Sequence, residues 1–268
     1  MRDVGEVRVE SLHGDGDGDG DGDGVAVIRL CRAAKLNALD ARMLEALEAA
    51  LSAVEESNAR ALIVTGEGKL FCAGGDIDAW SKLSPHDFAH RWVRRGHRIF
   101  DRLAQLRQVT VAAVNGHAMG GGLELAAACD FRVLDERARL SLPETALGMT
   151  PGWSGTQRLA RRFGAQTVRR MALAGEVFCA DESLARGLAD RVAAAGDSLT
   201  VAEQLARDIL ARGPAAVQTA KLMLAAFDGE STAAAVEALA GAAVAGGAEL
   251  REGVAAFKDK RAPVFKGK

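Results

Sequence analysis

The sequence predicts an α/β core followed by a C-terminal part that consists only of helices. Three observations support this prediction. Short β-branched runs alternate with helical apolar spacing between residues 25 and 142; a strand, a glycine-rich turn and a helix start follow one another at 110–130; and the spacing beyond Ser154 is helical. The chain of 268 residues is long enough for a large core with an appendage. We place the core at residues 1–195 and the helical region at 196–268.

The composition argues against several classes of partner. The net charge is -2, tyrosine is absent, and nine phenylalanines and three tryptophans are the only large aromatic residues, so neither charge nor base stacking favours nucleic acid or an anionic membrane. No run of eighteen apolar residues and no signal-peptide segment is present. The four cysteines (Cys31, Cys72, Cys129 and Cys179) have no paired spacing and are typical of a reducing compartment. We therefore expect a soluble, cytoplasmic protein.

The N-terminal elements are two β-rich segments at residues 6–12 and 25–31, which predict a hairpin. Between them lies a repeat of glycine and aspartate from Gly14 to Gly24. Such pairs favour turns and repel one another, so we expect a long, mobile connection. A calcium site is the alternative, but the repeat matches neither the EF-hand nor the nonapeptide calcium pattern.

The next predicted elements are a helix from Asn37, a buried strand at 61–65 and a helix from about 86 to 106. The first helix has apolar residues at spacings of three and four, namely Leu39, Met43, Leu47, Leu51 and Val54. His86 and His90 are four residues apart, as metal ligands can be. Because three arginines accompany them, a solvated basic face is the simpler interpretation, and we predict no metal site.

Residues 110–130 form the most informative stretch. The apolar run Thr110–Val114 ends at Asn115-Gly116, and after Gly120-Gly121-Gly122 a helical pattern begins with a single acid, Glu124. Three glycines remove every β-carbon, so a ligand atom could meet free N–H groups at a helix N-terminus. A lone carboxyl on an apolar helix would be desolvated, which raises its pKa. Alternatively, the glycines only allow close packing and Glu124 only favours the first helical turn.

Two short strands are expected at residues 131–134 and 139–142, and Pro143-Glu144 ends the second. Residues Gly152-Trp153-Ser154-Gly155-Thr156 come close to the nucleophile elbow of a serine hydrolase. The fifth residue is threonine and no histidine follows downstream, which disfavours that class. Helices are then expected at 154–163, 165–174, 181–187, 199–212, 214–227, 231–246 and 249–260.

Two turns and two acids make a possible chemical set. The turn Ala73-Gly74-Gly75-Asp76 resembles the glycine turn of residues 120–122, and Glu144 is a second acid beside Glu124. If both turns face one cleft, two backbone N–H groups could hold a developing oxyanion while the carboxyls exchange protons. No sequence rule proves that they converge.

In these stretches the sequence resembles the crotonase family, also called the enoyl-CoA hydratase/isomerase superfamily. The likeness runs in order from about residue 25 to 265 and is very specific for the family. It rests on Leu36-Asn37-Ala38-Leu39, Phe71 to Ile77, Ala113 to Gly116, Gly120 to Ala126, Cys129-Asp130, Leu142-Pro143-Glu144, Gly148, Pro151-Gly152, Gly155 to Leu159 and Phe257 to Phe265.

The resemblance implies a spiral of ββα units followed by a helical trimerisation region, assembled as a homotrimer or a dimer of trimers. It implies an acyl-CoA substrate and no further cofactor, coenzyme A being part of the substrate. Carried over by position, the amides of Gly75 and Gly121 would grip the thioester carbonyl. Glu124 and Glu144 would position a water and act as acid and base. The substrate and CoA path would be lined by Ala73, Gly75, Asp76, Ile77, Asp78, Gly121, Gly152 and Trp153.

The sequence departs from the common family pattern at four places. Trp153-Ser154 stands where small residues, often Ala-Gly, are usual, which would crowd the acyl pocket. Asp78 replaces a frequent lysine, Gly75 replaces a common alanine and His117 replaces an aromatic or aliphatic residue. These departures bear on acyl-chain specificity more than on catalysis.

We expect an enoyl-CoA hydratase that adds water to a trans-2-enoyl-CoA and gives a 3-hydroxyacyl-CoA. Relatives that lost the second acid became isomerases, decarboxylases or dehalogenases, so the presence of Glu144 favours hydration. Isomerisation, decarboxylation or hydration of an unusual acyl-CoA remain alternatives because of Trp153. A non-enzymatic RNA-binding or scaffold member is a further alternative, supported only by the arginine-rich stretches 91–98 and 158–170.

Overall fold

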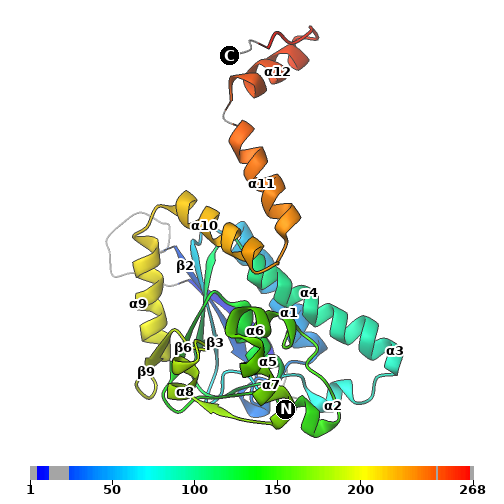
Figure 1. Ribbon diagram of the computed structural model, residues 1–268, viewed down its shortest axis with the longest axis vertical. Coiled ribbons are helices and arrows are strands. Elements are labelled where there is room, and N and C mark those ends of the chain that lie inside the picture. Colours follow the sequence, from blue (N-terminus) through cyan, green and yellow to red (C-terminus); the bar gives the residue numbers. More distant parts are fainter. Residues whose placement is uncertain (1–4, 12–23, 246, 266–268) are drawn as a thin grey trace. The chain divides into compact units, whose positions relative to one another are not determined.

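The computed structural model describes residues 5–11, 24–245 and 247–265 (Figure 1). The chain forms two compact units, Met1–Gln218 and Thr219–Lys268. Most of the Gly-Asp repeat, for which we predicted a mobile connection, lies outside the described residues. The predicted boundary between residues 195 and 196 concerns the extent of the spiral core and stays a prediction.

The first unit contains a six-stranded sheet and a three-stranded sheet. The larger sheet has the order β1 (Glu6–Ser11), β2 (Val25–Cys31), β3 (Ala61–Gly66), β4 (Val109–Val114), β6 (Phe131–Asp135) and β9 (Arg191–Ala193). Strand β1 is antiparallel to β2, and all the other pairs in this sheet are parallel. The smaller sheet has the order β5 (Ala118–Met119), β7 (Arg139–Ser141) and β8 (Phe178–Cys179). The predicted α/β class is therefore confirmed.

Helices cover both faces of the larger sheet (Figure 1). One set of alternate strand residues, such as Ile28 and Leu62, packs in a single core with the helices α1 (Ala41–Glu56), α4 (Arg94–Gln105), α5 (Gly121–Ala128), α6 (Gln157–Phe163) and α7 (Ala165–Ala174). The other set, such as Val27 and Ile63, packs against α9 (Ser198–Leu210). Because strand side chains alternate between faces, strands buried on both sides are apolar throughout.

Two sequence predictions need correction. The helix expected from Asn37 begins at Ala41, because the buried Asn37 side chain instead donates to the carbonyl oxygens of Glu67, Leu70 and Phe71. The chain beyond Ser154 is not purely helical, since it contains β8 and β9, and β9 joins the larger sheet beside β6. Strands of two or three residues are too short to show a period of two.

The remaining helices of the first unit are short. They are α2 (Ile77–Trp80), α3 (Pro85–Asp87), a π-helical segment η2 (Phe88–Val93), a 3-10 helix η3 (Glu144–Leu147) and α8 (Ala180–Ala185). Together α3, η2 and α4 account for the helix that the sequence predicted at 86–106. A further 3-10 turn, η1 (Ala33–Lys35), follows β2.

The second unit contains most of α10 (Pro214–Phe227), together with α11 (Thr232–Ala245) and α12 (Ala248–Lys258). Several large apolar side chains in it are exposed, among them Phe227, Val236 and Phe257. Within the described residues, no single helix is long and apolar enough to cross a membrane; only the bent pair of α11 and α12 reaches that length and composition together. The expected trimerisation through this region stays a prediction.

Candidate active site

The first glycine turn of the site follows β3 and is fixed by Leu39. The Leu39 amide donates to the Gly74 carbonyl and the Asp76 amide donates to the Leu39 carbonyl, both at 2.8 Å. Gly74 has a φ of 95°, a conformation that side-chain-bearing residues rarely adopt. The Gly75 N–H has no acceptor among the described residues and is available to a ligand.

The second turn leads from β5 into α5. Gly120 has a φ of 52°, and its amide donates to the Ser141 carbonyl at 2.9 Å, which ties the turn to β7. The next amide, that of Gly121, is the first of the helix and has no partner within the helix. A β-carbon placed on Gly121 would lie 3.4 Å from the Gly75 nitrogen, so the two turns meet.

The adjacent Gly122 differs from Gly121. A β-carbon on Gly122 would come within 2.1 Å of the Cys72 carbonyl oxygen, so this glycine is required for close packing. Gly121 borders a cavity instead. Packing alone therefore accounts for Gly122, whereas Gly121 both packs against Trp153 and borders the cavity.

Glu124 lies one turn into α5 and is 2% exposed. Its Oε1 accepts the backbone N–H groups of Trp153 at 2.7 Å and of Gly155 at 2.6 Å. Burial, and then the nearby Glu144 carboxyl, raise the pKa of Glu124 to about 8, although the two amides act in the opposite direction. This acid is fixed in position and holds its proton unusually strongly.

Glu144 begins η3, is separated from β7 by Leu142 and Pro143, and is half-buried. Its Oε2 is buried without a hydrogen-bond partner among the described residues. The other oxygen would lie 2.8 Å from a β-carbon on Gly120, so the glycine turn passes directly beneath this carboxyl. Burial also raises the pKa of Glu144.

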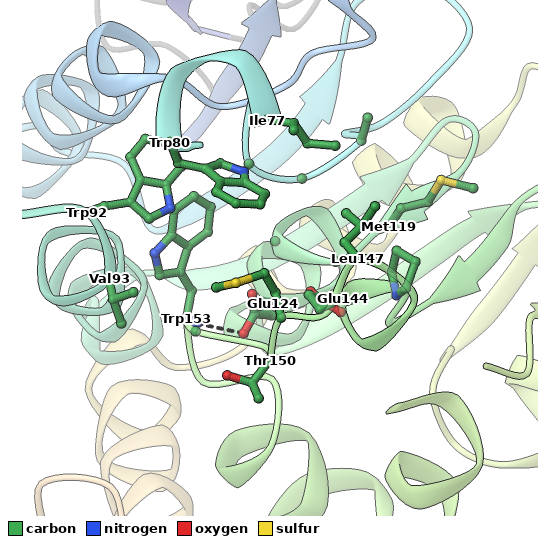
Figure 2. Close-up of a pocket in the computed structure, with 18 of the residues that line it drawn as sticks. Ile77, Trp80, Trp92, Val93, Met119, Glu124, Glu144, Leu147, Thr150 and Trp153 are labelled. Atoms are coloured by element: carbon green, nitrogen blue, oxygen red, sulfur yellow. Dashed lines mark hydrogen bonds between the residues drawn. The ribbon is translucent and has the colours of Figure 1, made fainter. Parts of the chain in front are cut away.

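The two turns and the two acids border one cavity of about 160 Å³ (Figure 2). Of the residues proposed from the sequence, it is lined by Ala73, Gly75, Ile77, Gly121, Glu124, Glu144, Gly152 and Trp153. The convergence that no sequence rule could prove is therefore present. Their chemical roles stay predictions.

Asp76 and Asp78, which were expected on the CoA path, do not line this cavity. Asp76 is 8% exposed, accepts the Ala79 amide at the start of α2, and pairs with Arg32 at 2.7 Å. The Asp78 side chain is exposed and pairs with Lys35 at 3.5 Å. Asp76 thus anchors the first turn, whereas Asp78 is a surface residue at the side of α2.

Sequence reasoning missed much of the cavity wall. It includes Trp80, Phe88, Trp92, Val93, Met119, Leu147 and Met149. Phe88 and Trp92 belong to the helix predicted at about 86–106, and both lie in the π-helical segment η2. The signal that could have found the wall is composition, because all three tryptophans of the chain line this cavity.

His97 contacts the 153–155 loop, whose amides bind Glu124. Ser154 has a φ of 82°, and its Oγ lies 3.3 Å from His97 Nδ1. His97 Nε2 is 3.2 Å from Asp101, and Asp101 pairs with the buried Arg158 at 2.6 Å. The histidine beside Ser154 thus comes from upstream in the sequence, and no histidine follows downstream. Ser154 does not line the cavity and is 5% exposed, so the contact fastens the loop.

The rings of His86 and His90 have centroids 4.6 Å apart and planes inclined at 42°. In the part of the chain that the structure describes, no group of three His, Cys, Asp or Glu side chains is placed to hold a metal ion.

The chain is similar to known proteins over most of its length. The sequence profile described as enoyl-CoA hydratase/isomerase matches residues 20–268. Crotonyl-CoA hydratase of Syntrophomonas wolfei is 36% identical over 247 residues, which cover 90% of this chain and 94% of that protein. Short-chain-enoyl-CoA hydratase of Clostridium acetobutylicum is 36% identical over 199 residues, or 74% and 76% of the two chains. The crystal structure of enoyl-CoA hydratase from Bacillus anthracis aligns with a TM-score of 0.76 at 33% identity, covering 98% of this chain and all of the other.

Proposed function

Because the chain belongs to the enoyl-CoA hydratase/isomerase family, we propose that it adds water to a trans-2-enoyl-CoA and releases a 3-hydroxyacyl-CoA. One observation carries the proposal. The carboxyls of Glu124 and Glu144 line the same cavity as the amides of Gly75 and Gly121. An oxyanion site next to two proton-exchanging acids is what addition of water to a conjugated thioester requires.

In the proposed complex the thioester carbonyl accepts hydrogen bonds from the Gly75 and Gly121 amides. These donors draw electrons from the conjugated system, so the β-carbon becomes electrophilic and the enolate-like charge is stabilised. One such donor typically contributes about 10²–10³ in rate. Gly121 is also the first residue of α5, and the positive end of the helix dipole favours the same negative charge.

The two carboxyls hold the attacking water in this proposal. The unpartnered Oε2 of Glu144 offers an acceptor to it, and Glu124 approaches from α5. As the water oxygen bonds to the β-carbon, its proton passes to the carboxyl pair, and Glu144 delivers a proton to the α-carbon. Because neighbouring carboxyls disfavour double ionisation, the pair shares one proton near neutral pH.

The test is hydration of crotonyl-CoA, followed by the loss of ultraviolet absorbance of the conjugated enoyl thioester. We expect 3-hydroxybutyryl-CoA as the product, with the same rate in the presence of a metal chelator, since we propose no cofactor. Folded protein, verified by circular dichroism, that turns over neither crotonyl-CoA nor longer enoyl thioesters would contradict the proposal. Products of isomerisation or decarboxylation from a panel of CoA esters would identify an alternative reaction.

We further propose assembly as a homotrimer or a dimer of trimers, supported by the exposed apolar side chains of the second unit, such as Phe227 and Phe257. Light scattering of the purified protein distinguishes these assemblies from a monomer.

A further inference from the structure

The indole of Trp153 lies in the cavity wall near the Trp92 side chain (Figure 2). It is next to the two glycines of the proposed oxyanion site. A β-carbon on Gly121 would lie 2.6 Å from its Cζ3 atom, so the ring rests on the glycine. On the other turn, a β-carbon on Gly75 would lie 3.5 Å from Cη2 of the same ring. A substrate group that extends past the two glycines in this direction therefore meets the indole.

Trp153 is held in this position from several sides. Its backbone N–H donates to Glu124, its ring centroid is 5.1 Å from that of Trp92, and Phe100 meets it edge-on at 5.3 Å. The side chain as a whole is 4% exposed. Such a side chain is a fixed part of the wall, since moving the indole would disrupt its packing against Trp92 and Phe100.

The opposite helix is shaped to accept this ring. Gly96 lies inside α4, where glycine is less favourable than alanine. A β-carbon on Gly96 would come within 2.3 Å of Trp153 Nε1, so an alanine there could not coexist with the indole as placed. The absence of a side chain at Gly96 thus leaves room for the Trp153 ring in the cavity wall.

The remaining cavity of about 160 Å³ is small. Ligand pockets of drug-sized molecules are commonly about 300–1,000 Å³. An apolar cavity of about 150 Å³ accommodates benzene, which has six carbon atoms. A cavity of this size, with the indole in its wall, is thus suited to a short acyl group.

We propose that Trp153 forms the end wall of the acyl pocket and restricts the substrates to enoyl thioesters with short acyl groups, of about four to six carbons. This inference rests on the proposed hydratase function and names its substrate class. Trp153 acts here as a specificity-determining residue, because it limits the length of the acyl group and takes no part in proton transfer.

The experiment measures kcat/KM of the full-length protein for crotonyl-, hexenoyl-, octenoyl- and decenoyl-CoA. We expect turnover of the first two and a decrease of about tenfold or more at octenoyl-CoA, because overpacking a fixed wall is strongly unfavourable. Trp153→Ala should allow turnover of octenoyl- and decenoyl-CoA. We expect kcat/KM to rise about fourfold for each methylene that enters the space vacated by the indole.

Trp153→Phe is the second variant, because it keeps an aromatic ring against Phe100 and removes an indole N–H that has no partner among the described residues. Trp153→Phe should shift the chain-length optimum of kcat/KM by a smaller amount than Trp153→Ala does. Leu173→Ala is the control, because Leu173 is exposed on α7 and is absent from the cavity lining, so the chain-length optimum should stay unchanged.

The outcomes separate this inference from the function on which it rests. The inference is overturned if the wild-type protein has the same kcat/KM for decenoyl-CoA as for crotonyl-CoA. It is also overturned if both Trp153 variants keep the chain-length profile of the wild type. If no enoyl-CoA is hydrated, the proposed function fails. In that case, the relative affinities of butyryl-CoA and octanoyl-CoA, measured by competitive binding, test the role of Trp153 alone. Tighter binding of octanoyl-CoA by the wild type would overturn the inference.

Discussion

The two acids of the cavity differ in how the fold treats them. Glu124 is on a helix, almost fully buried, and one of its oxygens accepts two backbone amides from the loop of Trp153 and Gly155. Glu144 is at the start of a 3-10 turn, half-buried, with one oxygen that has no partner among the described residues. Glu124 is thus held in place by two backbone amides, whereas Glu144 has an oxygen that can still accept a hydrogen bond.

In the proposed reaction, this difference would suit the two chemically identical groups to different tasks. A carboxyl held by two amides keeps its position while its proton comes and goes, so Glu124 suits the placing of a water. A carboxyl with a free oxygen can reorient toward a substrate carbon, so Glu144 suits proton delivery. In the proposed reaction, the surroundings of each carboxyl, more than its chemical identity, decide its role.

The largest effect is expected from neutralising either acid. Glu124→Gln and Glu144→Gln should each lower kcat for crotonyl-CoA hydration by about 10²–10⁴, the usual contribution of a positioned acid or base. The amide oxygen of Gln at position 124 can still accept the Trp153 and Gly155 amides, so the fold should persist. Steady-state kinetics measures the loss in kcat, and circular dichroism verifies that each variant is folded.

The double variant tests whether the two acids act as a unit. If they share one proton, the combined loss in kcat should be close to that of the worse single variant, because residues that act together are strongly non-additive. Losses that multiply would instead show that Glu124 and Glu144 act independently, against the paired mechanism.

The next effect concerns stability and pH. The folded pKa of Glu124, about 8, lies above its ordinary value of 4.5, so the native state binds more protons than the unfolded state between these values. The free energy of unfolding should therefore fall as pH rises from about 5 to 8, by at most about 1.4 kcal/mol per pH unit. Thermal unfolding at several pH values measures this.

Glu124→Gln is the matched control for the pH dependence, because it keeps the hydrogen bonds and cannot ionise. The decline in stability between pH 5 and 8 should be weaker in this variant, since the raised pKa of Glu124 is its expected source. An unchanged slope would show that Glu124 ionises normally and is less desolvated than its burial implies.

A smaller effect is expected from disturbing the hold on Glu124 without altering the acid. An alanine β-carbon at Gly155 would lie 2.6 Å from Glu124 Oε1 and must displace it. Gly155→Ala should lower kcat by about tenfold to a hundredfold, as misplacement by about 1 Å does. Gly253→Ala in α12, where nothing lies within 4 Å of the new carbon, is the control and should leave kcat unchanged.

Much of this site could be predicted from the sequence because its parts are locally conspicuous. A glycine run between a strand and a helix, and a single acid on an otherwise apolar helix, identified Gly121 and Glu124 without any tertiary information. Their partners Gly75 and Glu144 could be proposed as residue types, but bringing them together needed either the family resemblance or the structure.

The cavity wall and the shortest strands could not be predicted in this way. Trp92 has the spacing of a core residue on an amphipathic helix, and only packing places it beside Trp153. Strand β9 has three residues and owes its conformation to pairing with β6, so no local period reveals it. Asn37 has the pattern of a helix start, but its side chain is committed to carbonyl groups thirty or more positions away, beginning with Glu67.

The smallest expected effect tests the support behind Glu124. Ser154 holds a φ of 82°, which is unfavourable for a residue with a β-carbon, and its hydrogen bond to His97 compensates. His97→Ala should lower the free energy of unfolding by about 1 kcal/mol and kcat by about fivefold, with KM unchanged. Adding Ser154→Gly should restore much of both, because glycine adopts this conformation without strain. A His97→Ala loss that persists undiminished in the double variant, or that appears in KM alone, would show that His97 does not act through the loop. The backbone hold that distinguishes Glu124 from Glu144 would then depend on the 153–155 loop alone.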